Sequence, residues 1–353
     1  MKDRQRDITV DIAKGVGIIA IVVGHSSWNV SILNHTIPIG PFVYLWHLAI
    51  FFFCSGYLYK ETEEGIISYI VKRIKTLYIP FVKYSMIYLL FRYIFVWCKM
   101  VDGPQYGIGE LVIRITNVLT FNGIGELLAA FWFLPVMFFT MCIFNVMFVF
   151  SKRFSQKAAG IFRIIFSVLC GIVGVYAMEN QYGLVYNMQV VYLMIPIVYL
   201  GFCFKKFGVH LNMYKNIFIF VSSFLILCWV LSLGIGIVEL SKYMIINRYA
   251  FYPVTLVGII FCWSLSKVLE ETKHVSKAIA YLGNISFDIM ALHFVGIKMV
   301  DFLYGSITGN TENMSNFPYA FSNLYLVYYV MGLVLPVIIK KCLNKICNRG
   351  GEN

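Results

Sequence analysis

Ten apolar stretches of about twenty residues each run through this chain of 353 residues. A helix rises about 1.5 Å per residue, so about twenty apolar residues cross the ~30 Å hydrocarbon core of a bilayer. Hydrophobic residues make up 60% of the sequence and charged residues 13%, against roughly 25% charged residues in a soluble domain. The sequence therefore predicts an all-α, polytopic membrane bundle of about ten transmembrane helices. We expect these helices at residues 8–28, 42–59, 77–97, 125–149, 159–178, 189–204, 216–236, 251–268, 286–304 and 322–339.

The segments between these stretches are short. We therefore expect one transmembrane domain over residues 1–353, with no separate soluble domain. Chemistry carried out by such a chain takes place inside the bundle or at its two faces.

Lysine and arginine are unevenly divided between the two sets of connections. With the N-terminus in the cytoplasm, twenty-one of the 29 basic residues lie in inner segments or at the helix ends beside them. Cytoplasmic loops are normally enriched in these residues, so we predict a multi-pass protein of the plasma membrane with both termini cytoplasmic. The net charge of +12 then follows from topology, and no nucleic-acid partner is expected. The outer loops hold Lys99, Arg114, Lys242 and Arg248.

This orientation assigns a side to individual loop residues. The predicted inner residues include Arg153, Lys206 and Lys273. The predicted outer residues include Asn34, Glu239 and Glu312.

The nine cysteines lie mostly inside apolar runs. Their spacing matches neither a zinc site nor a secreted disulfide framework. We interpret them as small core residues and expect no metal.

The first apolar stretch carries three ionisable residues, Asp11, Lys14 and His25. Such residues are costly in a bilayer and usually face a protein interior or a watery cavity. Lys14 and His25 are eleven residues apart, which places them on one helix face about 16 Å apart. A cation at one end and a titratable imidazole at the other suit a site that binds an anion and reacts farther inside. The alternative is a structural polar pair; we expect Asp11 to orient or neutralise Lys14.

Four further residues have a functional and a structural interpretation each. Arg73 is either a phosphate ligand or an inner anchor of its helix. His47 is either part of the site or bonded to a carbonyl near the outer end of its span. His293 is either functional or a helix-packing residue beside Asp288, and Trp132 either stacks on a sugar or belongs to the core.

Five sequence motifs together resemble the membrane-bound acyltransferase family 3. The opening RDITVDIAKGVGIIAIVVGH is similar to the family's first helix, with Arg or Lys, ten residues and then His, here Lys14 and His25. The other four follow in order, and the resemblance covers nearly the whole chain. They are HLAIFFFCSGYLYK, which begins at His47, KRIKTLYIPF, which contains Arg73, FWFLPVMF, which contains Trp132, and LGNISFDIMALHF, which contains Ser286 and His293.

The resemblance implies an O-acetyltransferase. Family members commonly move acetyl from cytoplasmic acetyl-CoA to hydroxyls of cell-envelope or secreted carbohydrates, and capsule or exopolysaccharide is the first acceptor we expect. His25 would be the catalytic base or nucleophile, and Lys14 and Arg73 would bind the donor. Asp11, His47, Trp132, Ser286 and His293 would support the site or bind substrate. Acetyl-CoA is the donor substrate, and no bound cofactor is expected.

Two other function classes fit a many-spanned chain with buried charges. A glycolipid flippase or sugar permease would not consume acetyl-CoA and gives no reason for the spacing of Lys14 and His25. A sensor or scaffold subunit does not call for several buried charges. Turnover of labelled acetyl-CoA separates all three classes.

Overall fold

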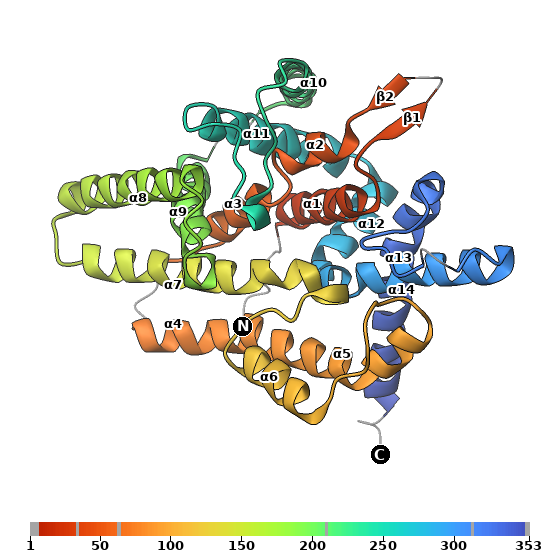
Figure 1. Cartoon of the computed structure of the whole chain (residues 1–353). Helices are drawn as coiled ribbons and strands as arrows, with labels where there is room; N and C mark the ends of the chain where they lie inside the picture. Colours follow the sequence, from red (N-terminus) through yellow and green to blue (C-terminus); the bar gives the residue numbers. More distant parts are fainter. Residues whose placement is uncertain (1–6, 33–34, 62–64, 209–210, 312–313, 350–353) are drawn as a thin grey trace.

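The computed structural model describes residues 7–32, 35–61, 65–208, 211–311 and 314–349. One short hairpin, β1 (Val30–Ile32) with β2 (His35–Ile37), projects from a body of helices (Figure 1). In chain order the helices are α1 (Ile8–Ser26), α2 (Ile39–Tyr44), α3 (Ala49–Tyr57), α4 (Ile66–Arg73), α5 (Ile79–Trp97), α6 (Ile108–Leu119), α7 (Phe133–Ser151), α8 (Gln156–Glu179), α9 (Met188–Phe207), α10 (Met213–Ser232), α11 (Phe251–Glu270), α12 (Lys273–Asn284), α13 (Ser286–Thr308) and α14 (Tyr325–Arg349).

Several of these helices join into continuous spans. In the part of the chain that the structure describes, nine helical segments are long and apolar enough to cross a membrane. Counting the pair α12 and α13, bent by 84° at Ile285, as one span gives ten. The prediction of an all-α bundle with about ten spans is therefore confirmed.

The third span is longer than the sequence indicates. It was expected at residues 77–97, whereas the structure continues it back to Ile66 through α4 and a π-helical turn, Ile74–Tyr78. The added part is amphipathic: Tyr69 is buried while Lys72 is exposed. Its charged residues lower the hydropathy and hide this extension from a search for apolar runs.

Helix α1 lies in the middle of the bundle. It contacts α2, α3, α11, α12, α13 and α14, and Figure 1 shows it in red at the centre. Polar side chains on α1 therefore have protein neighbours, which reduces the cost of placing them in a membrane.

Two glycines bring α1 and α12 into backbone contact. A Cβ on Gly15 would lie 2.1 Å from the carbonyl oxygen of Ile279, and one on Gly283 would lie 1.9 Å from that of Asp11. Real Cβ atoms do not come so close, so only glycine allows the two helices to approach this far. This contact holds the half of α1 that carries Lys14.

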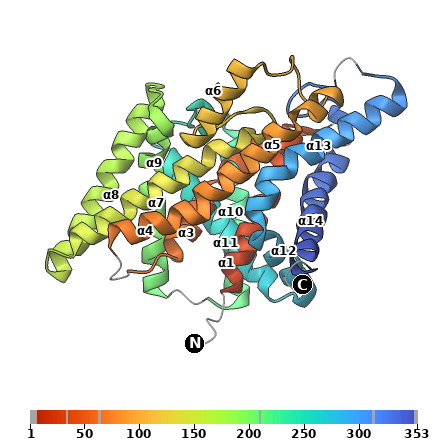
Figure 2. The same ribbon diagram turned by 90° about the horizontal axis from the view of Figure 1, so that it is seen from below.

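Helix α1 begins and α14 ends at the same edge of the molecule (Figure 2). This arrangement agrees with an even number of spans. The side of the membrane on which this edge lies stays a prediction from the charge distribution. Of the residues predicted outside, Asn34 and Glu312 lie outside the described residues.

Candidate functional site

His25 and His293 meet inside the bundle, although 268 residues separate them in sequence. His25 is in the last turn of α1, and His293 is in α13 with no exposed surface. The Nδ1 atom of His25 lies 3.0 Å from Nε2 of His293. The two rings are stacked, with centroids 5.1 Å apart, and Phe294 lies against both.

The contacts of His293 assign the protons of both rings. Its Nδ1 lies 3.1 Å from the carbonyl oxygen of Ile289 and 2.9 Å from that of Met290. Carbonyl oxygens only accept, so Nδ1 of His293 carries hydrogen, and in the neutral ring Nε2 is an acceptor. The Nδ1 of His25 then donates to it. This leaves Nε2 of His25 with a lone pair, the form that a base or nucleophile requires.

His47 lies at the break between α2 and α3. It is buried, its Nδ1 donates to the carbonyl oxygen of Val43 at 2.8 Å, and its ring packs on Tyr44. The carbonyl bond expected from the structural interpretation is present. The residue, however, lies in the interior of the span Ile39–Tyr57 and not near its outer end.

A small cavity of about 40 Å³ brings several of the predicted residues together. His25, His47 and Trp132 line it, and His293 lies behind His25. Trp132 comes from the 3₁₀ segment η2 (Glu126–Trp132), just before α7. A water molecule occupies ~30 Å³ in the liquid, so the cavity has room for about one.

Three polar residues in this cavity, Tyr44, Glu239 and Ser241, were not singled out from the sequence. Tyr44, at the end of α2, lies between His25 and His47, with ring centroids 6.3 and 4.7 Å away. Glu239, in the connection between α10 and α11, lines the same cavity. From the sequence, Glu239 is predicted only as an outer-loop residue. A signal was present, since Glu239 stands between two apolar residues that prove buried, Val238 and Leu240.

Lys14 is half-buried, three turns before His25 on α1. Among the described residues it makes no hydrogen bond or ion pair, so its ammonium group is available to an anion. That Asp11 orients or neutralises Lys14 stays a prediction. Asp11 itself is buried, and its backbone lies against Gly283 of α12.

Arg73 ends α4, directly before the π-helical turn. Its guanidinium lies over the Tyr69 ring at 4.7 Å, and Nη2 donates to the Tyr69 hydroxyl at 2.7 Å. Its Nε is buried and has no hydrogen-bond partner within the described ranges. Arg73 makes no direct contact with Lys14 or with the histidine cavity in the part of the chain described.

Ser286 opens α13 at the bend after α12. It is half-buried and does not line the histidine cavity. Among the residues that the structure describes, no group of three or more His, Cys, Asp or Glu side chains could hold a metal ion.

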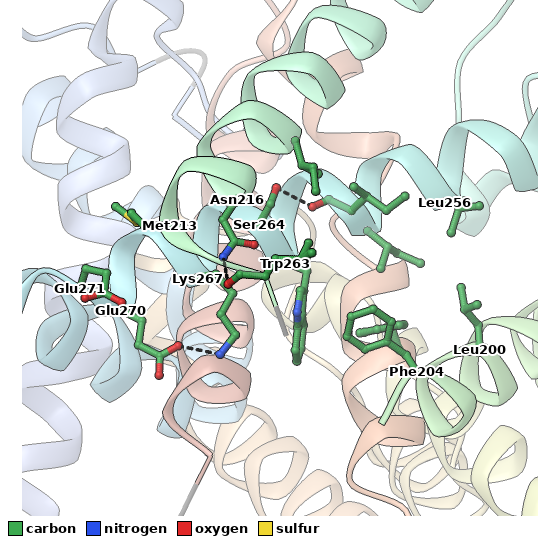
Figure 3. A pocket seen from close by; sticks show the side chains of 15 residues that line it. Leu200, Phe204, Met213, Asn216, Leu256, Trp263, Ser264, Lys267, Glu270 and Glu271 are labelled. Carbon is green, nitrogen blue, oxygen red and sulfur yellow. Dashed lines mark hydrogen bonds and ion pairs between the residues drawn. The ribbon is translucent and has the colours of Figure 1, made fainter. Parts of the chain in front are cut away.

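A larger cavity of about 550 Å³ lies elsewhere, between α3, α9, α10 and α11 (Figure 3). Its walls are mostly apolar and contain none of the site residues predicted from the sequence. Lys267 lies at one end and is paired with Glu270 at 2.9 Å, with Glu271 beside them. One ammonium group against two carboxylates does not favour phosphate, so this cavity does not suit the anionic part of acetyl-CoA.

Comparison with known proteins identifies the family of the chain. No curated protein and no solved structure matches the chain. The family model described as an acyltransferase domain, that of acyltransferase family 3, matches residues 7–341. The match includes both histidines, Lys14 and Arg73. The chain belongs to the membrane-bound acyltransferase family 3.

Proposed function

We propose that this acyltransferase is an O-acetyltransferase. It moves acetyl from cytoplasmic acetyl-CoA to a hydroxyl of a cell-surface or exported polysaccharide, with capsule or exopolysaccharide as the first acceptor to test. The observation that supports the proposal is the pair His25 and His293, whose contacts leave Nε2 of His25 unprotonated. The protein would act in the plasma membrane with both termini in the cytoplasm.

The histidine pair suggests how the transfer proceeds. The acceptor hydroxyl approaches Nε2 of His25, which takes its proton as the oxygen attacks the carbonyl carbon of the thioester. The carbon–sulfur bond then breaks, and the leaving thiolate takes the proton from His25. The products are an acetyl ester and the CoA thiol. General base catalysis of this kind contributes about 10²–10⁴-fold in rate.

A second route uses the same nitrogen as a nucleophile. Nε2 of His25 attacks the thioester, and acetyl-histidine forms as the thiolate leaves. The acceptor oxygen then attacks the acetyl carbonyl carbon, the carbon–nitrogen bond breaks to regenerate the imidazole, and the hydroxyl proton goes to the CoA thiolate. In both routes His293 is a positioning residue, because it accepts the Nδ1 hydrogen and holds the ring in one orientation. Its Nε2 lone pair also stabilises positive charge on His25.

Lys14 and Arg73 are the donor-binding residues in this proposal. Lys14 has an ammonium group without a partner, and Arg73 has an unpaired Nε, within the described residues. The phosphates of acetyl-CoA would bind to these groups at the inner side. Lys14 is about 16 Å from His25 along the helix, so the thioester arm would run along α1 toward the cavity.

The decisive experiment is acetyl-CoA turnover by the membrane-embedded protein. Inside-out vesicles containing the wild-type protein or His25→Ala are given acetyl-CoA labelled in the acetyl group. We expect CoA thiol release and label in an alkali-labile glycan ester with the wild type alone. A flippase or permease would release no thiol, and equal release by both proteins would remove His25 from the mechanism.

A further inference from the structure

The connection between α10 and α11 enters the bundle. We call residues 237–246 the plug. In Figure 1 the green segment leaves α10 at the edge of the molecule and runs toward α1 in the middle. Val238 and Leu240 are each 5% exposed and Ile246 is 8% exposed, whereas the residues just before the plug, 232–236, are exposed. Three apolar side chains of the plug therefore pack in the core although they belong to a loop, while Ser241, Lys242 and Met244 are exposed.

The tip of the plug is a closed unit. Glu239 and Met244 exchange two backbone hydrogen bonds, of 2.9 and 3.1 Å. Tyr243 completes the turn in the left-handed region, with φ of +59°. Because the tip is held by its own hydrogen bonds, it can move as one piece.

Glu239 is the acidic residue in the wall of the histidine cavity. It lines this cavity together with His25, Tyr44, His47 and Trp132. Its ion-pair partner is Lys242, 3.1 Å away, whose side chain is 69% exposed. A pair with so exposed a partner is weak, so hydroxyl groups of a ligand can compete for the carboxylate.

The side chains around Glu239 suit a carbohydrate. A carboxylate accepts hydrogen bonds from two hydroxyls, while the apolar face of a sugar ring packs on aromatic side chains. Tyr44 and Trp132 supply such rings in the same cavity, beside the base His25. An acceptor with a second hydroxyl next to the reacting one would contact Glu239 and His25 together.

The cavity as it stands is closed to such an acceptor. Its volume of about 40 Å³ is far below the roughly 300–1,000 Å³ of pockets that hold small molecules. The plug forms one wall of the cavity through Val238, Glu239, Leu240 and Ser241. Glycines with positive φ, Gly234 at +59° and Gly236 at +126°, precede it in an exposed stretch. Exposed glycines with positive φ are suited to serve as a hinge on this side of the plug.

We propose that Glu239 is an acceptor-binding residue carried on a movable plug. The plug withdraws from the cavity to admit a polyhydroxylated acceptor. It then returns, so that the Glu239 carboxylate accepts a hydrogen bond from the hydroxyl next to the reacting one. This inference rests on the proposed acetyl transfer and adds to it the group that selects the acceptor.

The test separates acceptor binding from donor binding. Acetyl transfer to the deacetylated envelope glycan of the expressing cells is measured for the wild type, Glu239→Gln and Glu239→Asp. The glycan and acetyl-CoA are titrated in turn. Glu239→Gln keeps the shape but loses the charge, and we expect the KM for glycan to rise about ten- to hundredfold, as for one lost charge-assisted hydrogen bond. The KM for acetyl-CoA should change much less, and Glu239→Asp should recover part of the loss.

Lys242→Gln is the matched control. It removes the ion pair with Glu239 but not the carboxylate that faces the cavity, so we expect a KM for glycan within about twofold of the wild type. An unchanged KM for glycan in Glu239→Gln would overturn the inference. So would equal losses in Glu239→Gln and Lys242→Gln, which would show that the ion pair only stabilises the loop. Failure of the proposed function itself gives a different result. In that case the wild type would show no CoA thiol release that is lost in His25→Ala.

Discussion

Nδ1 of His25 lies 3.0 Å from Nε2 of His293, and the second ring is itself bonded to two backbone carbonyls of its own helix. Because the two histidines have different neighbours, we assign them different roles. His25 lines the cavity, with His293 behind it. In the proposed mechanism His25 therefore touches substrate, whereas His293 acts through His25.

Replacing His25 with alanine should abolish acetyl transfer and leave the protein folded and inserted. One imidazole at the end of α1 contributes little to packing, but in the proposed mechanism it is the group that moves the proton. Size-exclusion chromatography in detergent verifies the fold, and thiol release measures activity. A variant that transfers acetyl at near the wild-type rate would move the catalytic assignment to His293.

Replacing His293 with asparagine should lower kcat about ten- to hundredfold while the KM for acetyl-CoA stays close to the wild-type value. Asparagine keeps a polar group on α13 but no longer presents Nε2 to His25. A purely structural role would lower the yield of folded protein without changing kcat per folded molecule. Steady-state kinetics on the folded fraction distinguishes the two outcomes.

Lys14→Arg should retain much of the activity, because the requirement at this position is a positive charge. Lys14→Met and Arg73→Met should weaken binding of acetyl-CoA by about 1.5–3 kcal/mol, or ten- to hundredfold in affinity. The dependence on glycan concentration should change less. Donor titrations at fixed acceptor measure this, and an unchanged acetyl-CoA dependence in both Met variants would show that the donor binds elsewhere.

Cysteine labelling in a cysteine-free background should confirm the orientation of the chain. Position 153, in the turn between α7 and α8, is predicted to be cytoplasmic, and position 242, in the plug, is predicted to be external. Both side chains are exposed in the structure. An impermeant reagent applied to intact cells should therefore modify Lys242→Cys and spare Arg153→Cys. The reverse pattern would invert the topology.

Removing the charge of Lys298 should destabilise the protein without a specific effect on substrate binding. Its ammonium group has no exposed surface, is paired with Asp301 at 2.7 Å and also donates to the carbonyl oxygens of Met314 and Asn316. Breaking a buried pair by removing one partner typically costs about 3–5 kcal/mol. Lys298→Met should lower the thermal unfolding midpoint, while KM values of the remaining folded protein stay near those of the wild type.

The spans could be predicted from the sequence because a helix needs about twenty apolar residues to cross the bilayer. The start of the third span at Ile66 could not be predicted in this way, because the charges of the amphipathic helix α4 conceal it. The short helix α12 before the 84° bend was not predicted either. Both lie where the hydropathy signal is diluted by lysine and arginine.

The site residues could be predicted one by one but not as a constellation. The spacing of Lys14 and His25 is a property of a single helix, and it is visible in the sequence. The contact between His25 and His293 joins two helices far apart in the chain, and only the packing of α1 against α13 creates it. The position of Glu239 beside the histidines depends on a loop that folds back into the core. Hydropathy gives little indication of such a loop.

The two glycine contacts between α1 and α12 have a consequence for the histidines at the other end of α1. Gly15 and His25 are ten residues apart, or about 15 Å along the helix. Gly283 and His293 are likewise ten residues apart, across the bend. The α1 helix is thus attached to the α12–α13 pair at two separate points, once by backbone contact and once by the imidazole bond. Two contacts this far apart resist sliding and rotation of α1 relative to α13 more than either contact does alone. The alignment of the two rings is therefore set in part by glycines at the opposite end of the helix, where no chemistry takes place.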